Sequence, residues 1–175
     1  MRQPKKNIEI KAKCADLRAA ARAAKALGAQ RVGVLHQTDT YFHVRSGRLK
    51  LREIREGRSR RAELIAYSRA DRAMARESTY HVVPATDSGT MKSALDSALR
   101  IRAVVRKRRE LWMYHNVRVH LDRVEGLGTF IEFEAVLGAG SDRSLSRKRL
   151  RELCKALRVE RRDQLAQSYV DLLAL

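Results

Sequence analysis

The chain has 175 residues, of which 38 are Lys or Arg and 20 are Asp or Glu, so its formal net charge is +18. This length is typical of one domain with its own core, and we expect a single domain over residues 1–175. Hydrophobic residues at 44% and charged residues at 33% exclude general disorder. No run approaches the ~18 apolar residues of a membrane helix, and the start of the chain lacks the apolar core of a signal peptide. We therefore expect a cytoplasmic protein with no membrane partner.

The cysteines and the excess of basic residues indicate which kinds of ligand the protein can bind. The two cysteines, Cys14 and Cys154, lack both CxxC spacing and a Cys/His partner, so we expect packing roles for them rather than a disulfide or a zinc site. The excess of basic residues predicts a polyanionic ligand, which could be a nucleic acid, an acidic membrane surface or a phosphate-rich small molecule. No helix-turn-helix, zinc-finger, RRM or phosphate-loop motif is present, and we expect no specific nucleic acid partner.

The first half of the chain predicts strands around one helix. Polar and apolar residues alternate from Asn7, which is the period of a strand, and Asp16 can cap a helix over Leu17–Leu27. Further strands are predicted over 34–44, 48–54, 63–69 and 78–83. The arginine-rich stretch 55–61 is predicted to be a solvated loop, and Pro84 is predicted to end its strand.

The second half adds a helix, three strands and two closing helices. Asp87 or Ser88 can cap a helix over Met91–Leu99. Strands are predicted over 104–114, 117–124 and 129–137, followed by helices over 145–157 and 164–173. About eight strands joined mostly by short turns, with four helices, predict an α+β fold: an antiparallel sheet or barrel with helices outside.

Several predicted strands have one apolar face and one face charged with both signs, as in Arg48, Lys50 and Arg52 opposite Leu49 and Leu51. If the apolar faces pack outward against the helices, the charged faces line a common interior, and eight strands can enclose one small ligand. A triphosphate with Mg²⁺ or Mn²⁺ would neutralise such an interior. The alternative is a solvated sheet face with cross-strand ion pairs.

Several segments of the predicted strands, and one near the end of the chain, carry linked motifs. They are Asn7-Ile8-Glu9-Ile10-Lys11, Gln37-Thr38-Asp39-Thr40-Tyr41-Phe42, Arg48-Leu49-Lys50-Leu51-Arg52, Lys107-Arg108-Arg109-Glu110-Leu111, the run from Leu121 to Glu132 and Ser168-Tyr169. Together these segments resemble the CYTH superfamily, and within it the branch of class IV adenylyl cyclases. The resemblance covers residues 7 to 172 in order. It implies an eight-stranded antiparallel β-barrel, or tunnel, with flanking α-helices, whose charged lumen binds a triphosphate with Mg²⁺ or Mn²⁺.

The resemblance also implies roles for particular residues. The Glu-x-Glu-x-Lys signature of the family falls on Asn7, Glu9 and Lys11, so Asn7 departs from it, and an amide in place of an acid would weaken or remove one of two metal sites. The implied catalytic residues are Glu9, Lys11, Glu132 and Glu134. The implied metal ligands are Glu9, Asp122, Glu132 and Glu134. The implied triphosphate contacts are Lys11, Lys50, Arg52, Lys107, Arg109 and Arg118.

Other residues of these strands have less definite roles. Lys13 and Arg48 share the lumen-facing parity, and either Arg69 or Arg76 would supply a further basic group. Tyr41 and Tyr169 are expected to pack rather than to catalyse. His120 shares a face with Arg118 and Asp122, where a neutral structural role and a catalytic role both stay open.

Class IV adenylyl cyclase chemistry, which converts ATP to cyclic AMP and pyrophosphate, is the first functional prediction. The alternatives are an inorganic or organic triphosphatase and a non-catalytic nucleotide- or polyphosphate-binding module. A nucleoside or inorganic triphosphate is therefore the expected partner, and the sequence leaves open a homodimer formed through the outer helices.

Overall fold

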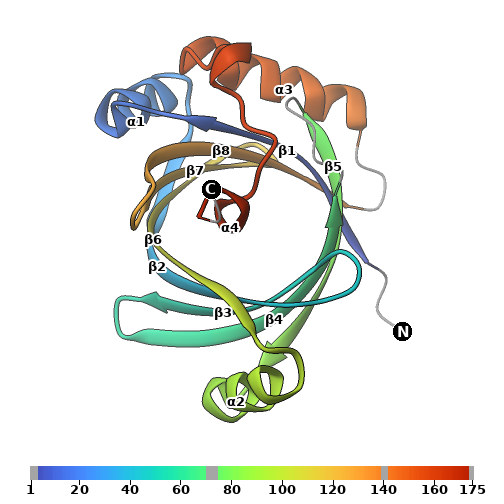
Figure 1. Cartoon of the computed structure of the whole chain (residues 1–175). Helices are drawn as coiled ribbons and strands as arrows, with labels where there is room; N and C mark the ends of the chain where they lie inside the picture. Colours follow the sequence, from blue (N-terminus) through green and yellow to red (C-terminus); the bar gives the residue numbers. More distant parts are fainter. Residues whose placement is uncertain (1–3, 70–74, 139–141, 174–175) are drawn as a thin grey trace.

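Eight antiparallel strands close into a barrel in the order β1-β5-β4-β3-β2-β6-β7-β8 within the computed structural model, which describes residues 4–69, 75–138 and 142–173 (Figure 1). The strands are β1 Lys5–Lys13, β2 Gln30–Phe42, β3 Arg48–Glu56, β4 Ser59–Arg69, β5 Arg76–Ala85, β6 Ile101–Tyr114, β7 Val117–Val124 and β8 Gly128–Leu137. Every neighbouring pair is antiparallel. The predicted α+β barrel with flanking helices is confirmed.

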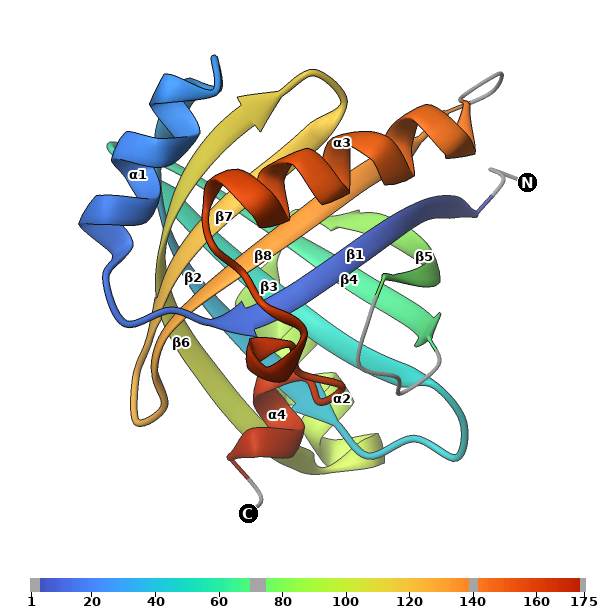
Figure 2. The same cartoon turned by 90° about the horizontal axis from the view of Figure 1, so that it is seen from above.

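The helices are α1 Leu17–Ala26, α2 Ser88–Leu99, α3 Arg143–Ala156 and α4 Tyr169–Leu172, with a short 3₁₀ helix at Arg161–Asp163. Aspartates cap the first three: the side chain of Asp16, for example, accepts hydrogen bonds from two backbone N–H groups of α1. Figures 1 and 2 show α1 and α3 outside the β1-β8-β7 wall, α2 at the opposite side and α4 at the barrel mouth. Across the described residues, no helix is both long enough and apolar enough to span a membrane.

The apolar core lies between the barrel wall and the outer helices. Ile8, Val119 and Phe133 are fully buried on the outward faces of their strands, where they belong to one cluster with Leu150 and Leu153 of α3. Complete burial of such side chains contributes about 1.5–3 kcal/mol each. The core therefore sits outside the barrel, and the inward faces are left to polar residues. Cys14 and Cys154 are free and pack against this cluster.

A smaller apolar cluster holds α2 against the barrel. Phe42 and Leu51 are buried there against Met91, Leu95 and Leu99 of the helix. Because strand residues alternate, the positions next to Phe42 and Leu51 in the sequence face the lumen.

Two predictions at strand ends are wrong. The stretch 55–61 is not a loop, since β3 and β4 pair up to Glu56 and Ser59 and the turn between them is only Gly57 and Arg58, with Gly57 at φ 56°. Pro84 does not end its strand, because β5 continues to Ala85. At Pro84 the strand pairs with β4 alone, since β1 pairs with β5 only up to Tyr80, so Pro84 lies at an edge position, where proline is tolerated in a sheet.

The predicted helix over 164–173 is also wrong for most of its length. Only Tyr169–Leu172 is helical. The backbone before it is used by β1 instead: Leu165 donates its N–H to the carbonyl of Lys11 at 2.8 Å, and Gln164 forms a bridge with Ala12. This contact positions Tyr169 at the mouth of the barrel.

Candidate active site

The barrel encloses a cavity of about 180 Å³ lined by side chains of all eight strands and of α4. All the basic and acidic residues implied for the triphosphate and the catalytic chemistry line it. They are Glu9, Lys11, Lys50, Arg52, Lys107, Arg109, Arg118, Glu132 and Glu134. Strand alternation brings them together, because each occupies the parity opposite to the apolar residues that pack on the helices. The charged faces therefore line an interior and are not a solvated sheet surface.

Asp39 of β2 organises one side of the cavity. Its carboxylate accepts hydrogen bonds from Arg52 at 2.6 and 2.9 Å, from Lys107 at 2.6 Å and from Lys50 at 3.2 Å, and it is only 1% exposed. Burial alone would raise the pKa of Asp39, but the charges of Arg52, Lys107 and Lys50 hold it well below its usual range. Three cations are thus fixed by one buried anion.

Burial acts in the opposite direction on the lysines around Asp39. Desolvation, together with the charge of Arg52, lowers the pKa of Lys50 well below its usual value even though Asp39 opposes the shift. Desolvation likewise lowers the pKa of Lys107 from 10.5 to about 8. Both amines are consequently poised to gain from an added anion, which would favour their protonated forms.

A second cluster is built around Arg109 of β6. Arg109 donates two hydrogen bonds, at 2.7 and 2.6 Å, to the carboxylate of its cross-strand partner Asp122, and one at 3.2 Å to Glu132. Tyr169 of α4 donates its hydroxyl to Asp122 at 2.9 Å, and its ring lies 3.7 Å from the ammonium group of Lys11. Both Asp122 oxygens are therefore held by Arg109 and Tyr169. Tyr169 packs in the mouth as predicted and also orients two charged groups.

Lys11 and Glu132 form the third arrangement. They are cross-strand partners on β1 and β8, and their charged groups lie 3.3 Å apart. Burial would raise the pKa of Glu132, but Lys11 and Arg109 hold it well below its usual range. This glutamate is therefore an anion at neutral pH in the described arrangement.

Glu9 and Glu134 are directly opposite each other in the β1–β8 ladder. Two like charges at such positions destabilise a sheet unless a cation lies nearby. Arg118 lies 3.4 Å from Glu134, and Asn7, which is 4% exposed, donates to Glu134 at 2.6 Å. The Oδ1 atom of Asn7 is buried and has no hydrogen-bond partner. Carboxylate oxygens and an unpartnered amide oxygen are the donors that a hard divalent cation prefers, so this end of the lumen fits Mg²⁺ or Mn²⁺.

The described residues hold no preassembled group of three acidic, His or Cys side chains at metal-binding separation. Glu132 and Glu134 are instead engaged with Lys11, Arg109, Arg118 and Asn7. His120 is also buried here, 3.9 Å from Glu134, and desolvation together with Arg109 lowers its pKa well below 6.5. His120 is therefore neutral, and its Nδ1 has no hydrogen-bond partner among the described residues.

One wall of the cavity differs from the rest. Ile65 and Tyr67 of β4 and Tyr80 and Val82 of β5 face the lumen there, opposite the charged groups. Apolar and aromatic side chains in a site of this kind can contact an organic group beside the phosphates.

Sequence reasoning missed several lining residues and overestimated others. Asp39, Glu63, Ser78 and the tyrosines of β4 and β5 line the cavity without having been singled out as site residues. Asp39 shares the parity of Gln37 and Tyr41, which is the signal that could have found it. Arg48 pairs with Asp171 of α4 at 2.9 Å, Lys13 is exposed, and the side chains of Arg69 and Arg76 lie outside the described residues.

A family model described as the CYTH domain matches residues 5–169. A Methanocaldococcus jannaschii protein named "Putative adenylate cyclase MJ0240" is 30% identical over 71 residues, which are 41% of this chain and 41% of that relative. Among solved structures, the PH1012 protein of Pyrococcus horikoshii OT3 matches with a TM-score of 0.80 and 24% identity, over 95% of this chain and 98% of that one. HpAC1 of Hippeastrum, described as revealing a dominant triphosphatase activity, matches with a TM-score of 0.63 and 12% identity, over 97% and 95% of the two chains.

Proposed function

The chain belongs to the CYTH family, and from this premise we propose that its barrel lumen binds a triphosphate with a divalent cation and converts it enzymatically. The observation that carries the proposal is the lumen itself. Six Lys and Arg side chains from four strands converge there on a cavity of about 180 Å³. Guanidinium and ammonium groups at such density are suited to phosphate oxygens, and fixed cations around a transferring phosphoryl group are the main demand of its chemistry.

Five of the six lumen cations divide into two groups, and the sixth, Arg118, lies beside Glu134. Lys50, Arg52 and Lys107 form one group around Asp39, and Arg109 and Lys11 form the other around Asp122 and Glu132. A bound triphosphate would lie between them and take over part of the charge that the carboxylates now neutralise. We propose that Asp39 and Asp122 act by positioning these cations, which modifies the metal-ligand role first predicted for Asp122.

A divalent cation would be held by Glu9 and Glu134, with the Asn7 amide oxygen and Glu132 as further oxygen donors. When bound, it supplies Lewis-acid stabilisation of the negative charge that develops on the phosphate oxygens. The chain's own residues orient the phosphates, exclude bulk water from the cationic groups and keep Glu132 ionised.

The reaction proposed first is cyclisation of ATP, in which the ribose 3′-hydroxyl attacks the α-phosphorus and pyrophosphate leaves. The run from Asp122 through Glu125-Gly126 to Gly128 resembles the cyclase branch. The wall of Ile65, Tyr67, Tyr80 and Val82 supports a nucleoside triphosphate over a purely inorganic one, because it offers contacts that phosphate alone would not use.

Hydrolysis is the second candidate, and the size of the cavity favours it. A volume of about 180 Å³ is below the ~300–1,000 Å³ of pockets that enclose a whole drug-sized ligand, so it suits a phosphate chain better than a complete nucleotide. The triphosphatase activity described for HpAC1 points the same way.

The test is ³¹P NMR of the purified protein with Mg²⁺ or Mn²⁺, with ATP and inorganic triphosphate in separate samples. Cyclic AMP with pyrophosphate supports the cyclase, and orthophosphate with ADP or pyrophosphate supports the hydrolase. Unchanged substrate with broadened resonances would identify a binding module without turnover and contradict the proposed enzyme.

The matched variants are Glu132→Gln in the lumen and Glu56→Gln on the surface, where Glu56 is 42% exposed beside Arg61. Glu132→Gln should lower metal-dependent turnover by at least about 100-fold, because it removes the anion that holds Lys11 and Arg109 and a proposed metal donor. Glu56→Gln should change turnover less than twofold. Undiminished activity in Glu132→Gln, with the fold intact by circular dichroism, would refute the site assignment.

A further inference from the structure

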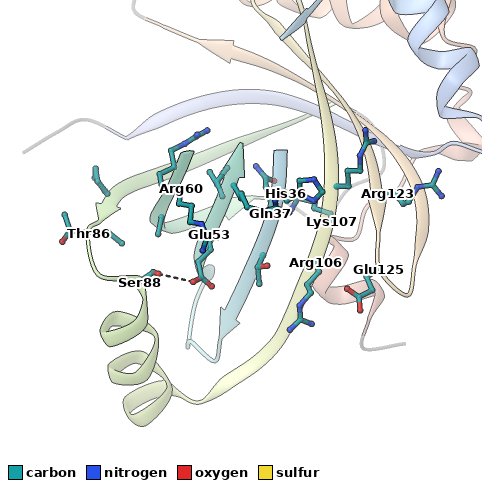
Figure 3. Close-up of a pocket in the computed structure, with 18 residues that line it drawn as sticks. His36, Gln37, Glu53, Arg60, Thr86, Ser88, Arg106, Lys107, Arg123 and Glu125 are labelled. Atoms are coloured by element: carbon teal, nitrogen blue, oxygen red, sulfur yellow. Dashed lines mark hydrogen bonds between the residues drawn. The ribbon is translucent and has the colours of Figure 1, made fainter. Parts of the chain in front are cut away.

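A second and larger hollow lies next to the start of α2, and its lining includes exposed outward residues together with the buried inward-facing Gln37 and Lys107. Its volume is about 1030 Å³, and it is lined by residues of β2 to β7 and of the start of α2 (Figure 3). Six arginines belong to it: Arg55, Arg60, Arg61, Arg106, Arg108 and Arg123. We call this surface the arginine groove. Of its lining residues, Lys107 also lines the lumen cavity, whereas the six arginines do not.

Strand alternation shows that the arginines which β6 contributes to the groove face outward. Lys107 and Arg109 are buried in the lumen, so Arg106 and Arg108 on the other parity of β6 point away from it, and both are exposed. Figure 3 shows the labelled Arg60, Arg106 and Arg123 around the hollow, with the hydrogen bond from Ser88 to Glu53 at its α2 border.

Arginines of β3, β6 and β7 form a row across four neighbouring strands, to which β2 contributes His36. Arg55 is the ladder partner of His36, His36 is also the partner of Arg108, and Arg108 is the partner of Arg123. With neighbouring strands about 4.8 Å apart, the row extends over roughly 14 Å. Like charges directly opposite one another destabilise a sheet. No ion pair joins Arg55, Arg108 or Arg123 to any described residue, so nothing in that part of the molecule relieves the repulsion.

The acids of the groove do not neutralise the row. Among the residues that the structure describes, Glu53 and Glu125 are the acids that line the groove. Glu53 is already paired with Lys92 of α2 at 2.5 Å and accepts the hydroxyl of Ser88. The groove therefore carries a large positive excess that an external polyanion would relieve.

The other features of the arginine groove indicate which class of polyanion it binds: an acidic peptide, a membrane surface or a nucleic acid. The unpaired edge of β5 beyond Tyr80 is short and contains Pro84, which has no N–H to donate to a peptide strand, and exposed Arg–carboxylate pairs contribute only about 0–1 kcal/mol each. Within the described part of the chain, no aromatic ring other than that of His36 lines the groove, so bases have little to stack on. None of the exposed large apolar residues of the described chain lines it either, which leaves no group to insert into a membrane.

Nucleic acid differs from these partners because each neutralised phosphate releases condensed counterions, and this release drives binding without any base contact. Arginine also matches phosphate with two parallel hydrogen bonds. We infer that the arginine groove binds the phosphate backbone of a nucleic acid duplex independently of sequence. This agrees with the absence of any sequence-reading motif, and it does not depend on the proposed enzymatic function.

The test compares two variants of equal charge change in the full chain. The groove variant combines Arg106→Gln, Arg108→Gln and Arg123→Gln. The control combines Lys148→Gln, Arg151→Gln and Lys155→Gln, three exposed residues of α3 without a side-chain hydrogen bond to any described residue. The assay is fluorescence anisotropy of a short labelled DNA duplex of mixed sequence, measured at several salt concentrations.

Wild type and control should bind alike, whereas the groove variant should bind at least about tenfold more weakly. Each lost phosphate contact lowers the slope of log K against log salt by about 0.9, so the groove variant should have a slope smaller by about two to three. A second mixed sequence should bind with the same affinity. Triphosphate turnover should be equal in all three proteins, which separates this test from that of the lumen.

Equal losses in the groove and control variants would overturn the inference, because binding would then reflect only net charge. Competition by polyglutamate at concentrations as low as those of unlabelled duplex would also overturn it in favour of an acidic polypeptide. Groove-dependent binding of inorganic polyphosphate without binding of the duplex would assign the groove to a different polyanion.

Discussion

Replacing Asp39 by Asn tests the idea that one buried anion holds three lumen cations in place. Asp39 is 1% exposed, and its two oxygens accept from Arg52, Lys107 and Lys50. The amide keeps the size of the side chain but removes its charge and places an NH₂ group among donors. The cations would then repel one another in a cavity with little water to screen them.

The expected cost follows from this geometry. Removing one partner of a buried ion pair destabilises a protein by about 3–5 kcal/mol, because the other charge stays buried and unpaired. Lys50 and Lys107 can limit this cost by releasing protons, since burial has already lowered the pKa of both. Arg52 cannot. We therefore expect a loss of about 3–5 kcal/mol at pH 6, corresponding to roughly 6–20 °C in Tm for a chain of this size, and a smaller loss at pH 9.

The assay is urea unfolding of wild type, Asp39→Asn and Glu56→Gln, with and without inorganic triphosphate. Glu56→Gln removes a carboxylate whose partner Arg61 is 46% exposed, so it should cost no more than about 1 kcal/mol. Triphosphate should stabilise Asp39→Asn more than wild type, because its phosphates replace the missing anion. A loss below about 1 kcal/mol in Asp39→Asn, or equal triphosphate stabilisation in both proteins, would refute this account of the lumen.

Two further predictions concern protons and metal in the lumen. The pKa of Lys107, lowered from 10.5 to about 8, means that the unfolded chain binds more protons between these values. The contribution of Lys107 to stability should therefore rise with pH across that window, whereas the affinity for triphosphate should fall. The Lys107→Arg variant should bind triphosphate without this decline in affinity. Calorimetry at pH 7 and pH 9.5 checks both proteins. Asn7→Asp places a third carboxylate near Glu9 and Glu134, so it should lower Tm in the absence of metal and raise Mn²⁺ affinity by about tenfold. Unchanged Mn²⁺ affinity in calorimetry would remove Asn7 from the proposed donor set.

The barrel could be predicted from the sequence because its strands alternate strictly. Outward residues such as Ile8 and Val119 are fully buried, and the inward residues between them are charged, so local periodicity and global packing agree. The strand ends were harder to predict. The stretch 55–61 looks like a loop because its arginines face solvent, yet its backbone is paired across β3 and β4. The segment before Tyr169 looks helical, but its backbone bonds with β1, a contact too distant in sequence for local patterns to reveal.

The lumen residues could be predicted as a set, but their pairing could not. Parity and resemblance together place Lys50, Lys107 and Arg109 inside, whereas only the register of the ladders shows that Asp39 faces Arg52 and that Asp122 faces Arg109. Cross-strand partners are set by turn lengths and by bulges such as the shift near Gly33 in β2. The sequence thus supplies the charges, and the fold decides which of them neutralise one another.

The net charge of +18 is therefore a poor guide to the tunnel. Six Lys or Arg side chains and five Asp or Glu side chains line the lumen. Asp122, which accepts hydrogen bonds from Arg109, is a sixth acid, so the two signs are equal in number. A balanced interior is what closure of a barrel requires, because an excess of one sign would be buried without compensation. The positive excess must then lie outside the lumen. The arginine groove is one place where it is concentrated, and its exposed charges are screened by salt far more than the buried pairs around Asp39.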